Sequence, residues 1–267
     1  MTDKTGLGDR MKGYEAVTRA VLPRRTYTII RVDGRSFHSY LSGAVKPYDF
    51  GFMAEMDEVA LALCKEISGA QFAFVQSDEI SVLVTDFASN GTQPWFGGVV
   101  QKMTSVSAAL ASVTLSRLRD SHAPAVFDSR VFTVPDPTEV AAYFIWRQRD
   151  CVRNSITMAA QAFFSHRELH GVNTGQMQEL LWSQCGVNWN DYPDGAKRGR
   201  WIVKTGGERP VSYRDSRTGE QVTKTAYRTW WEAQPAPYFA FELTSPLRDS
   251  IPDYPTFHAL NGFEVAA

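Results

Sequence analysis

A chain of 267 residues is long enough to bury a substantial core and fits one large domain, or one domain with an appendage. Its 43% hydrophobic and 21% charged residues are ordinary for a soluble globular protein, and its net charge of −1 does not by itself indicate a nucleic-acid partner. Three scattered cysteines provide neither a zinc motif nor a disulfide framework.

The N-terminal residues 1–15 are too polar for a signal peptide. No apolar run approaches the roughly 20 residues that a membrane-spanning helix needs. We therefore expect an intracellular, cytoplasmic protein that does not associate with a membrane.

The first elements in chain order are a predicted helix at 9–21, a strand at 27–32 and a helix that ends near residue 67. Asp33 and Gly34 interrupt the strand. Gly34 would let the following backbone N–H groups approach a phosphate, although Asp-Gly is also an ordinary turn signal. Asp49 is a suitable N-cap for the helix after it.

Residues 71–85 predict a hairpin, because two short apolar runs rich in β-branched and aromatic residues flank Asp78 and Glu79. These carboxylates would lie beside a core that offers no counter-charge, which is costly unless a cation binds. Asp33 ends a separate strand. Two strand-end aspartates, side by side in one sheet, form a minimal cage for Mg²⁺, with water and substrate phosphate as its other ligands.

The second half of the chain predicts helices, then short strands. A helical stretch at 95–119 is followed by a strand at 127–135. Asp136 has the capping pattern of a helix that runs to near residue 165. A further helix begins at Asn173 or Thr174 and ends before Gly186. Beyond residue 188 we expect loops and short strands at 201–204, 211–214, 222–227 and 238–243.

Residues 187–231 hold nine Lys or Arg against five Asp or Glu, interleaved with Trp and Tyr. This composition suits phosphate contact and base stacking. A solvated, β-rich surface is an equally good interpretation of the charge pattern alone.

Five motifs follow one another in the chain: RVDGRSFH, KPYD, FVQSDEISVLV, FDSR and WRQRDCVRNS. In this order the chain resembles, over about residues 9–205, the tRNA-His guanylyltransferase family and its Thg1-like relatives, the 3′-to-5′ nucleic acid polymerases. The resemblance implies an α+β fold in which helices flank a polymerase-palm-like antiparallel sheet, with a helical and short-strand C-terminal part. It also implies a homotetramer.

On this resemblance, residues 1–135 would form the palm-like catalytic domain, and residues 136–267 would pack on it and bind tRNA. Asp33 and Asp78 would hold two Mg²⁺ ions with help from the Gly34 carbonyl, and Glu79 would lie beside them as a further catalytic residue. ATP and GTP, or another nucleoside triphosphate, would be the substrates.

The implied nucleotide-binding residues are Gly34, Arg35, Ser36, Phe37, His38, Lys46, Asp49 and Ser77. The residues implied to contact phosphates of the nucleotide or the RNA are Arg31, Lys102, Arg130, Arg153 and Asn154. A strand-edge salt bridge is the alternative role for Arg31 and Arg130.

Two departures from the family pattern bear on function. Val152, Arg153, Asn154 and Ser155 stand where the eukaryotic enzymes have His-Ile-Asn-Asn, and residues 97–99 lack the Lys or Arg that family members often have there. Both favour the Thg1-like branch, which repairs tRNA 5′ ends under the direction of a template. The alternatives are G-1 addition to tRNA-His, a palm-type signalling nucleotide cyclase, and a non-catalytic RNA-binding protein.

Overall fold

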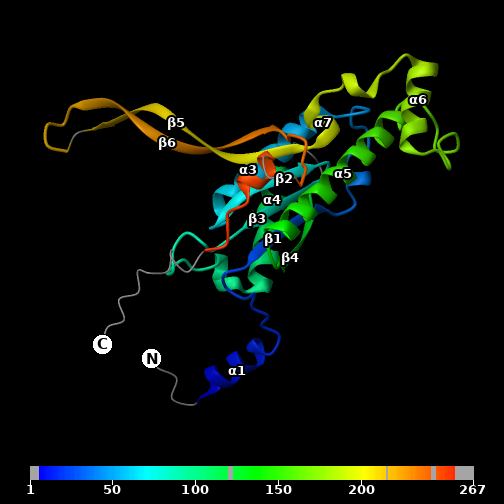
Figure 1. The fold of residues 1–267 in the computed structure, drawn as a ribbon. Coiled ribbons are helices and arrows are strands. Elements are labelled where there is room, and N and C mark those ends of the chain that lie inside the picture. Colours follow the sequence, from blue (N-terminus) through cyan, green and yellow to red (C-terminus); the bar gives the residue numbers. More distant parts are fainter. Residues whose placement is uncertain (1–5, 120–122, 215, 242–244, 256–267) are drawn as a thin grey trace.

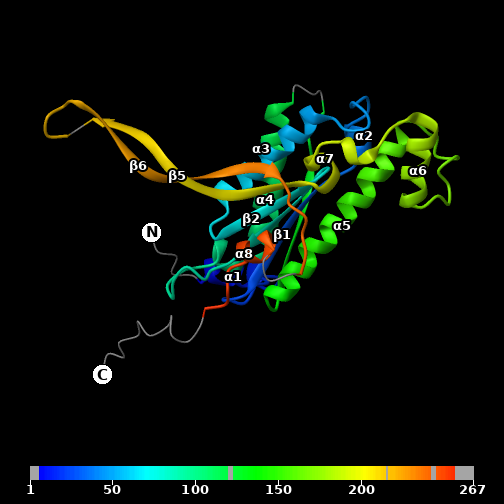
Figure 2. The ribbon, with the colours of Figure 1, turned by 45° about the horizontal axis from the view of Figure 1, so that its top comes forward.

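A computed structural model describes residues 6–119, 123–214, 216–241 and 245–255. Its centre is a six-stranded sheet in the order β4-β1-β3-β2-β5-β6, with every neighbouring pair antiparallel (Figures 1 and 2). The strands are β1 (Tyr27–Gly34), β2 (Ala70–Gln76), β3 (Glu79–Val84), β4 (Phe127–Val134), β5 (Arg200–Arg214) and β6 (Gln221–Pro235). The predicted α+β fold with an antiparallel sheet is confirmed.

Long helices cover both faces of the sheet. Helices α3 (Phe50–Glu66) and α4 (Val100–Leu118) pack on one face, and α5 (Pro137–Gln161) crosses the other. The shorter helices are α1 (Leu7–Ala16), α2 (Phe37–Tyr40), η1 (Trp95–Gly98), α6 (Thr174–Cys185), η2 (Trp189–Asp191), α7 (Asp194–Arg198) and α8 (Pro246–Ser250). Among the described residues, none of the helices has both the length and the apolar character to cross a bilayer.

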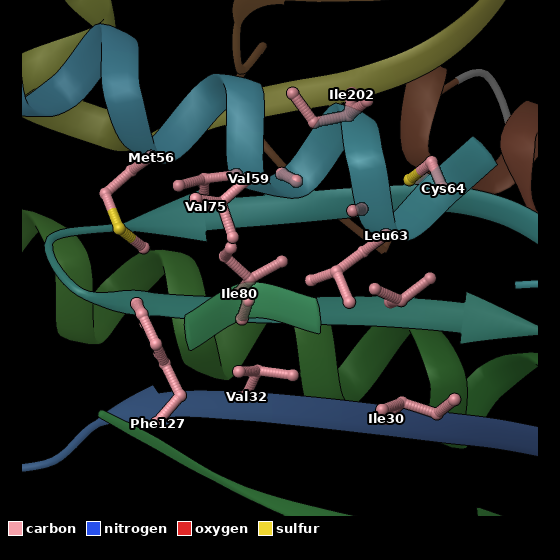
Figure 3. Close-up of a cluster of buried hydrophobic side chains, with 14 of the residues drawn as sticks. Ile30, Val32, Met56, Val59, Leu63, Cys64, Val75, Ile80, Phe127 and Ile202 are labelled. Atoms are coloured by element: carbon pink, nitrogen blue, oxygen red, sulfur yellow. The ribbon is translucent and has the colours of Figure 1, made fainter. Parts of the chain in front are cut away.

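Alternation along β1 divides its side chains between the two faces. Ile30 and Val32 are fully buried against α3 and α4, in the core that Figure 3 shows. Ile29 points to the other face, into the core beneath α5. Because side chains two apart in a strand share a face, Arg31 and Asp33 also lie on the α5 side of the sheet.

Several helices begin at the N-cap residues that the sequence predicts. The Asp49 side chain accepts a hydrogen bond from Phe52 N at 2.9 Å, and that of Asp136 accepts from Thr138 N at 2.7 Å. Asn173 caps α6, which ends at a left-handed glycine, Gly186. A carboxylate or amide here satisfies backbone N–H groups that the first helical turn leaves unpaired.

Other predicted boundaries are wrong. Helix α1 ends at Ala16, five residues before the predicted end, and buries none of its side chains. Helix α5 ends at Gln161 rather than near residue 165, and a short η1 turn precedes α4. Beyond the last residues of α1 and α5, apolar residues continue in the sequence, but the backbone forms only separate turn hydrogen bonds there.

The predicted short strands of the C-terminal half are also wrong. β5 and β6 form one hairpin, paired from Arg200 opposite Pro235 to Arg214 opposite Gln221. Only 200–203 pair with β2, so the remainder projects from the body as a two-stranded arm (Figure 1). Residues 238–241 form no strand, and residues 242 and 243 of that prediction lie outside the described chain. The boundary at residue 135 stays a prediction, although β5 and β6 extend the same sheet.

Candidate active site

The end of β1 meets the turn between β2 and β3. Asp33 lies opposite Glu79 in the antiparallel pair, and Gly34 N donates a hydrogen bond to the Asp78 carbonyl oxygen at 3.1 Å. The turn is tight, with Ser77 in the left-handed region at φ 47°. The predicted adjacency of these strand ends is therefore present, while the catalytic and metal-binding roles of Asp33 and Asp78 stay predictions.

Asp78 carries a carboxyl group that is short of positive charge. Burial raises its pKa to about 6, and the nearby carboxylates of Asp33 and Glu79 act in the same direction, while hydrogen bonds from the backbone N–H of Asp78 and from the Ser77 side chain oppose the rise. A cation placed between Asp33 and Asp78 would relieve this unfavourable electrostatics.

The available donors fit Mg²⁺, which prefers oxygen ligands and keeps several positions for water and substrate. The two carboxylates and the Gly34 carbonyl are all hard oxygen donors. Within the described ranges no cluster of three or more His, Cys, Asp or Glu could hold a metal ion. Such a site would thus depend on substrate phosphate and water to complete the coordination.

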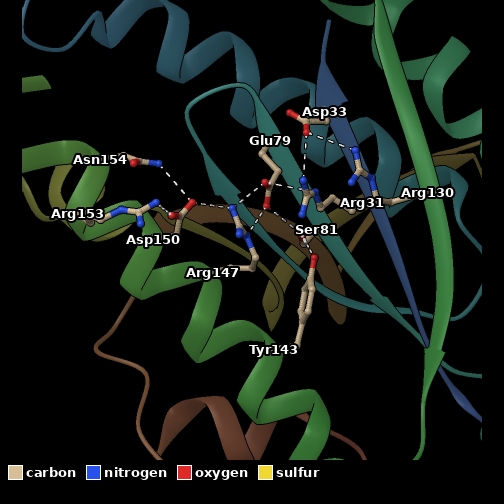
Figure 4. Close-up of polar contacts among 10 residues, drawn as sticks. All are labelled: Arg31, Asp33, Glu79, Ser81, Arg130, Tyr143, Arg147, Asp150, Arg153 and Asn154. Atoms are coloured by element: carbon tan, nitrogen blue, oxygen red, sulfur yellow. Dashed lines mark hydrogen bonds and ion pairs between the residues drawn. The ribbon is translucent and has the colours of Figure 1, made fainter. Parts of the chain in front are cut away.

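Glu79 differs from Asp78 because two arginines neutralise it (Figure 4). Arg147 on α5 donates from Nε to Oε1 at 2.8 Å and from Nη2 to Oε2 at 2.9 Å, and Arg31 Nε lies 3.3 Å from Oε2. The expectation that the hairpin carboxylates lack a counter-charge is therefore wrong for Glu79. Burial raises its pKa, and both guanidinium groups oppose that rise.

This pairing suits a positioning role for Glu79. Both of its carboxylate oxygens are engaged by buried or half-buried guanidinium groups, in the bidentate geometry that gives arginine–carboxylate pairs their directionality. Glu79 directly follows Asp78, so the clamp from α5 also holds the turn that carries Asp78.

Helix α5 extends this network outward, as Figure 4 shows. Arg147 also donates to Asp150 at 2.9 Å, and Asp150 in turn accepts from Arg153 and Asn154. Tyr143 and Ser81 share a hydrogen bond of 2.9 Å between their hydroxyl groups. Arg153 and Asn154 are thus connected to Glu79 through Asp150 and Arg147, and their role in contacting phosphate or RNA stays a prediction.

Three residues of this network are not among the site residues that the family resemblance implies: Tyr143, Arg147 and Asp150. A sequence signal was present, because these residues are spaced by four and three positions and therefore share one side of a helix. Nothing in the spacing indicated that this side would face Glu79.

Arg31 and Arg130 both approach Asp33. Arg31 Nη2 lies 3.2 Å from Asp33 Oδ2, and Arg130 Nη2 lies 3.8 Å from the same atom and 3.5 Å from Asp128 Oδ1. The salt-bridge alternative is therefore present for both. Arg130 remains 53% exposed at its side chain, so its charge is also accessible to a phosphate.

After Gly34 the chain turns sharply, and the side chain of Phe37 points into the core rather than toward the surface. Phe37 is buried, with its ring centroid 4.9 Å from that of Phe127, so its side chain faces the core and only its backbone could contact a nucleotide. A Cβ on Gly34 would lie 2.3 Å from the Phe37 ring, which requires glycine there. Arg35, Ser36 and His38 are exposed.

The KPYD segment is joined to α3 and α5. The Asp49 side chain is occupied by the α3 cap and by Val45 N at 3.2 Å, while Lys46 is exposed. The Tyr48 hydroxyl lies 2.9 Å from Ser155 Oγ, and Trp189 Nε1 donates to that same oxygen at 3.0 Å. Ser155, one of the departures from the family pattern, thus ties three segments together.

Lys102 is not brought to the carboxylates within this chain. The α4 residue that reaches the start of β4 is Ser112, which accepts from Phe127 N at 3.0 Å. Lys102 lies ten residues earlier on α4, about 15 Å along the helix axis. Its assignment to phosphate contact stays a prediction.

An antiparallel sheet with helices on both faces, and acidic strand ends facing a cationic helix, is the arrangement of a palm-type nucleotidyltransferase. Comparison with known proteins specifies the family. Residues 8–135 match the family model described as tRNAHis guanylyltransferase.

Solved relatives agree over a larger part of the chain. A bacterial tRNA(His) guanylyltransferase (Thg1)-like protein in complex with ATP is 42% identical, with a TM-score of 0.71 over 73% of this chain and 87% of that one. A bacterial Thg1-like protein in complex with GTP is 36% identical, with a TM-score of 0.71 over 87% and 93% of the two chains. Among curated sequences rather than solved structures, the tRNA(His) guanylyltransferase of Debaryomyces hansenii is 27% identical over 74% of this chain and 78% of its own.

The chain therefore belongs to the Thg1 family of tRNA(His) guanylyltransferases and Thg1-like proteins, and it is a nucleotidyltransferase.

Proposed function

We propose that this protein adds nucleotides to the 5′ end of tRNA in the 3′-to-5′ direction, under the direction of a template, and so repairs incomplete 5′ ends. The observation that carries the proposal is the adjacency of two aspartates, Asp33 and Asp78, where Gly34 N donates to the Asp78 carbonyl oxygen. The 42% identity to a bacterial Thg1-like protein supports the same proposal. The missing family histidine at Val152 supports the repair branch over dedicated recognition of a His anticodon.

The reaction has two phosphoryl-transfer steps. The RNA 5′-monophosphate attacks the α-phosphate of ATP, which forms an adenylylated 5′ end and releases pyrophosphate. The 3′-hydroxyl of the incoming nucleoside triphosphate then attacks the activated 5′ phosphate, forms the new phosphodiester bond and releases AMP.

Asp33, Asp78 and the Gly34 carbonyl would hold two Mg²⁺ ions in this reaction. The chemistry that Mg²⁺ supplies when bound is a lower pKa for the attacking hydroxyl and a partial neutralisation of the phosphates. Glu79, clamped by Arg147 and Arg31, keeps the Asp78 turn in the geometry that binding requires.

The remaining predicted residues would bind nucleotide and RNA. Backbone N–H groups of residues 36–38, together with Lys46 and Ser77, would bind the activating nucleotide, whereas Gly34 N and Arg35 N already donate to the carbonyl oxygens of Asp78 and Val126. Arg31 and Arg130, now paired with Asp33, would exchange part of that contact for a phosphate, because charge-assisted bonds to phosphate are of comparable strength. Arg153, Asn154 and Lys102 would contact phosphates farther along the substrate.

The test is to incubate the protein with ATP, labelled nucleoside triphosphates and Mg²⁺, with and without a 5′-truncated tRNA. Label in the RNA, with extension that stops when the acceptor stem is fully paired, supports the proposal. Label in a cyclic nucleotide without RNA would identify a cyclase instead. No label in any product would favour RNA binding without catalysis.

G-1 addition to tRNA(His) is the second candidate, because several curated relatives carry that name, including the Debaryomyces hansenii enzyme. Truncated tRNAs that differ in the anticodon or in the templating base separate the two. Repair predicts anticodon effects below about tenfold, or 1.4 kcal/mol, and addition of the base that pairs with the template. Strict dependence on a GUG anticodon, or G added opposite every base, would identify the guanylyltransferase.

Two further properties belong to the same proposal. The family resemblance supports a homotetramer, which the mass of the native protein in solution would test. It also supports a cytoplasmic location, since tRNA is the proposed substrate, and fractionation of cells that express the full chain would test that.

A further inference from the structure

Trp146 is an exposed aromatic side chain that is held in place by buried neighbours. Its side chain is 54% exposed, whereas Phe144 and Ile145 before it and Arg147 and Gln148 after it are buried. Exposing so large an apolar surface brings no folding stability, because burial is what stabilises an indole. A single exposed tryptophan is not unusual in itself, so its surroundings must decide its role.

Those surroundings fix the orientation of the indole. The guanidinium carbon of Arg147 lies 4.4 Å from the Trp146 ring centroid, within the range of a cation–π contact. Arg147 cannot turn away easily, because its Nε and Nη2 donate to Glu79 and its Nη2 also donates to Asp150. The Tyr143 ring packs edge-on against the indole at 5.8 Å.

The position of the indole relates it to the carboxylate site. The contacts run from Trp146 to Arg147, from Arg147 to Glu79, and Glu79 is adjacent to Asp78 in the chain. Tyr143 continues the contacts to β3 through Ser81. The exposed ring is thus attached to the same rigid network that places the Asp78 turn.

Cations follow Trp146 along the exposed side of α5. Arg149 and Arg153 come three and seven residues after it, so all three side chains project on one side of the helix, and both arginines are exposed. An aromatic ring flanked by cations suits a nucleic acid, whose bases stack and whose phosphates pair with arginine.

We infer that Trp146 is a stacking platform for a nucleobase at the edge of the active site, with Arg149 and Arg153 contacting the adjoining phosphates. The inference rests on the proposed function, since it assumes a nucleotide substrate at the carboxylates. A ring that is already oriented loses little conformational freedom on binding, so stacking on it is more favourable than on a freely rotating side chain.

The experiment compares the wild type with Trp146→Ala, Trp146→Phe and the control Trp182→Ala. Trp182 is a suitable control because it is 61% exposed on α6, outside the network around Arg147. The dissociation constant of a 5′-truncated tRNA transcript is measured by fluorescence anisotropy, and the KM and kcat for the incoming nucleotide by incorporation of label. Melting temperature and native mass are recorded for each variant.

We expect Trp146→Ala to weaken one of the two binding steps by roughly tenfold, as loss of one base–aromatic stack does. Trp146→Phe should stay close to the wild type, and Trp182→Ala should equal it. A weaker tRNA complex would assign the stack to an RNA base, and a raised nucleotide KM with unchanged tRNA binding would assign it to the base of the incoming nucleotide.

The inference is overturned if Trp146→Ala leaves both values unchanged, or if Trp146→Phe binds no better than Trp146→Ala. A change of native mass in Trp146→Ala with unchanged affinities would instead place the ring in a contact between copies. If the wild type incorporates no label at all, the proposed function fails, while tRNA affinity still tests the stacking.

Discussion

Both the network around Glu79 and the arm formed by β5 and β6 place cations against aromatic rings, but the cation of the network is buried and also pairs with carboxylates. In the network, Arg147 is 6% exposed and pairs with two carboxylates. In the arm, cations lie over aromatic rings, with the guanidinium carbon of Arg209 3.5 Å from the Trp230 ring centroid and Lys204 Nζ 5.6 Å from that of Trp231.

The reason for the difference is the dielectric surroundings. The buried guanidinium group of Arg147 on α5 has lost its hydrating water, and a paired anion offsets the free-energy cost of that desolvation. On the arm, water still solvates the charge, and an aromatic ring provides a modest contact that leaves the cation accessible. The network therefore holds its side chains in a fixed geometry, and the arm keeps cations such as Lys204 and Arg209 exposed, which suits the predicted contact with RNA phosphates.

The largest expected effect is on catalysis. Asp33→Asn or Asp78→Asn should reduce nucleotide incorporation by roughly 10³-fold or more, because each removes a carboxylate from the proposed Mg²⁺ site. Asp128→Asn is the matched control, since Asp128 lies opposite Asp33 on the edge strand but is largely exposed. Turnover close to the wild type in either active-site variant would refute the metal assignment.

The buried ion pair between Arg147 and Glu79 should contribute more to stability than the exposed contacts of the arm. Arg147→Met leaves Glu79 buried with one fewer counter-charge, so we expect a loss of about 3 kcal/mol in the free energy of unfolding, measured with urea. The double variant Glu79→Gln with Arg147→Met should lose clearly less than the sum of the single variants. Arg209→Met on the arm should cost only about 0.5 kcal/mol. If the stability loss of the double variant equals the sum of the two single losses, Glu79 and Arg147 do not stabilise each other.

Asp78 should give the network a distinctive pH dependence. Its folded pKa of about 6 is above the value of 3.8 for a free side chain, so in the absence of Mg²⁺ the folded state binds more protons and loses stability as pH rises between these values. Asp78→Asn should then be more stable than the wild type in EDTA at pH 8, by about 1–2 kcal/mol after allowance for solvent screening.

The gain of Asp78→Asn should shrink as pH falls from 6 toward 4, and Mg²⁺ should stabilise the wild type but not the variant. Thermal unfolding at several pH values, with EDTA or with Mg²⁺, measures both effects. If the extra stability of Asp78→Asn does not change with pH, burial does not raise the pKa of the Asp78 carboxyl group.

The arm should produce the smallest effects, and they should be electrostatic. If the arm contacts tRNA phosphates as predicted, Arg209→Gln or Lys224→Gln should weaken tRNA binding a few-fold and reduce the slope of log affinity against log salt by about 1, because each variant would lose one phosphate contact. Ser212→Ala, on the same hairpin, should change neither. An unchanged salt slope in both charge variants would exclude the arm from the RNA interface.

Much of the fold and part of the site follow from sequence signals that act over a few residues. The hairpin at 71–85 and the N-caps Asp49 and Asp136 were predictable, because side-chain alternation and capping depend on neighbours within about four positions. Asp33 could be placed at a strand end for the same reason. That this strand end lies beside the Asp78 turn was a hypothesis, because strand direction and register cannot be deduced from the two patterns; the antiparallel pairing of Asp33 with Glu79 was decided by the tertiary structure.

The tertiary structure alone decided the partner of Glu79 and the shape of the C-terminal half. Arg147 is 68 residues from Glu79, and their contact exists because α5 packs across the face of β1 and β3. The short apolar patterns at 201–227 could not show that β5 and β6 pair along their whole length, or that the start of β5 pairs with β2. Long-range pairing depends on which surfaces the rest of the chain leaves to be covered, and no local pattern encodes that choice.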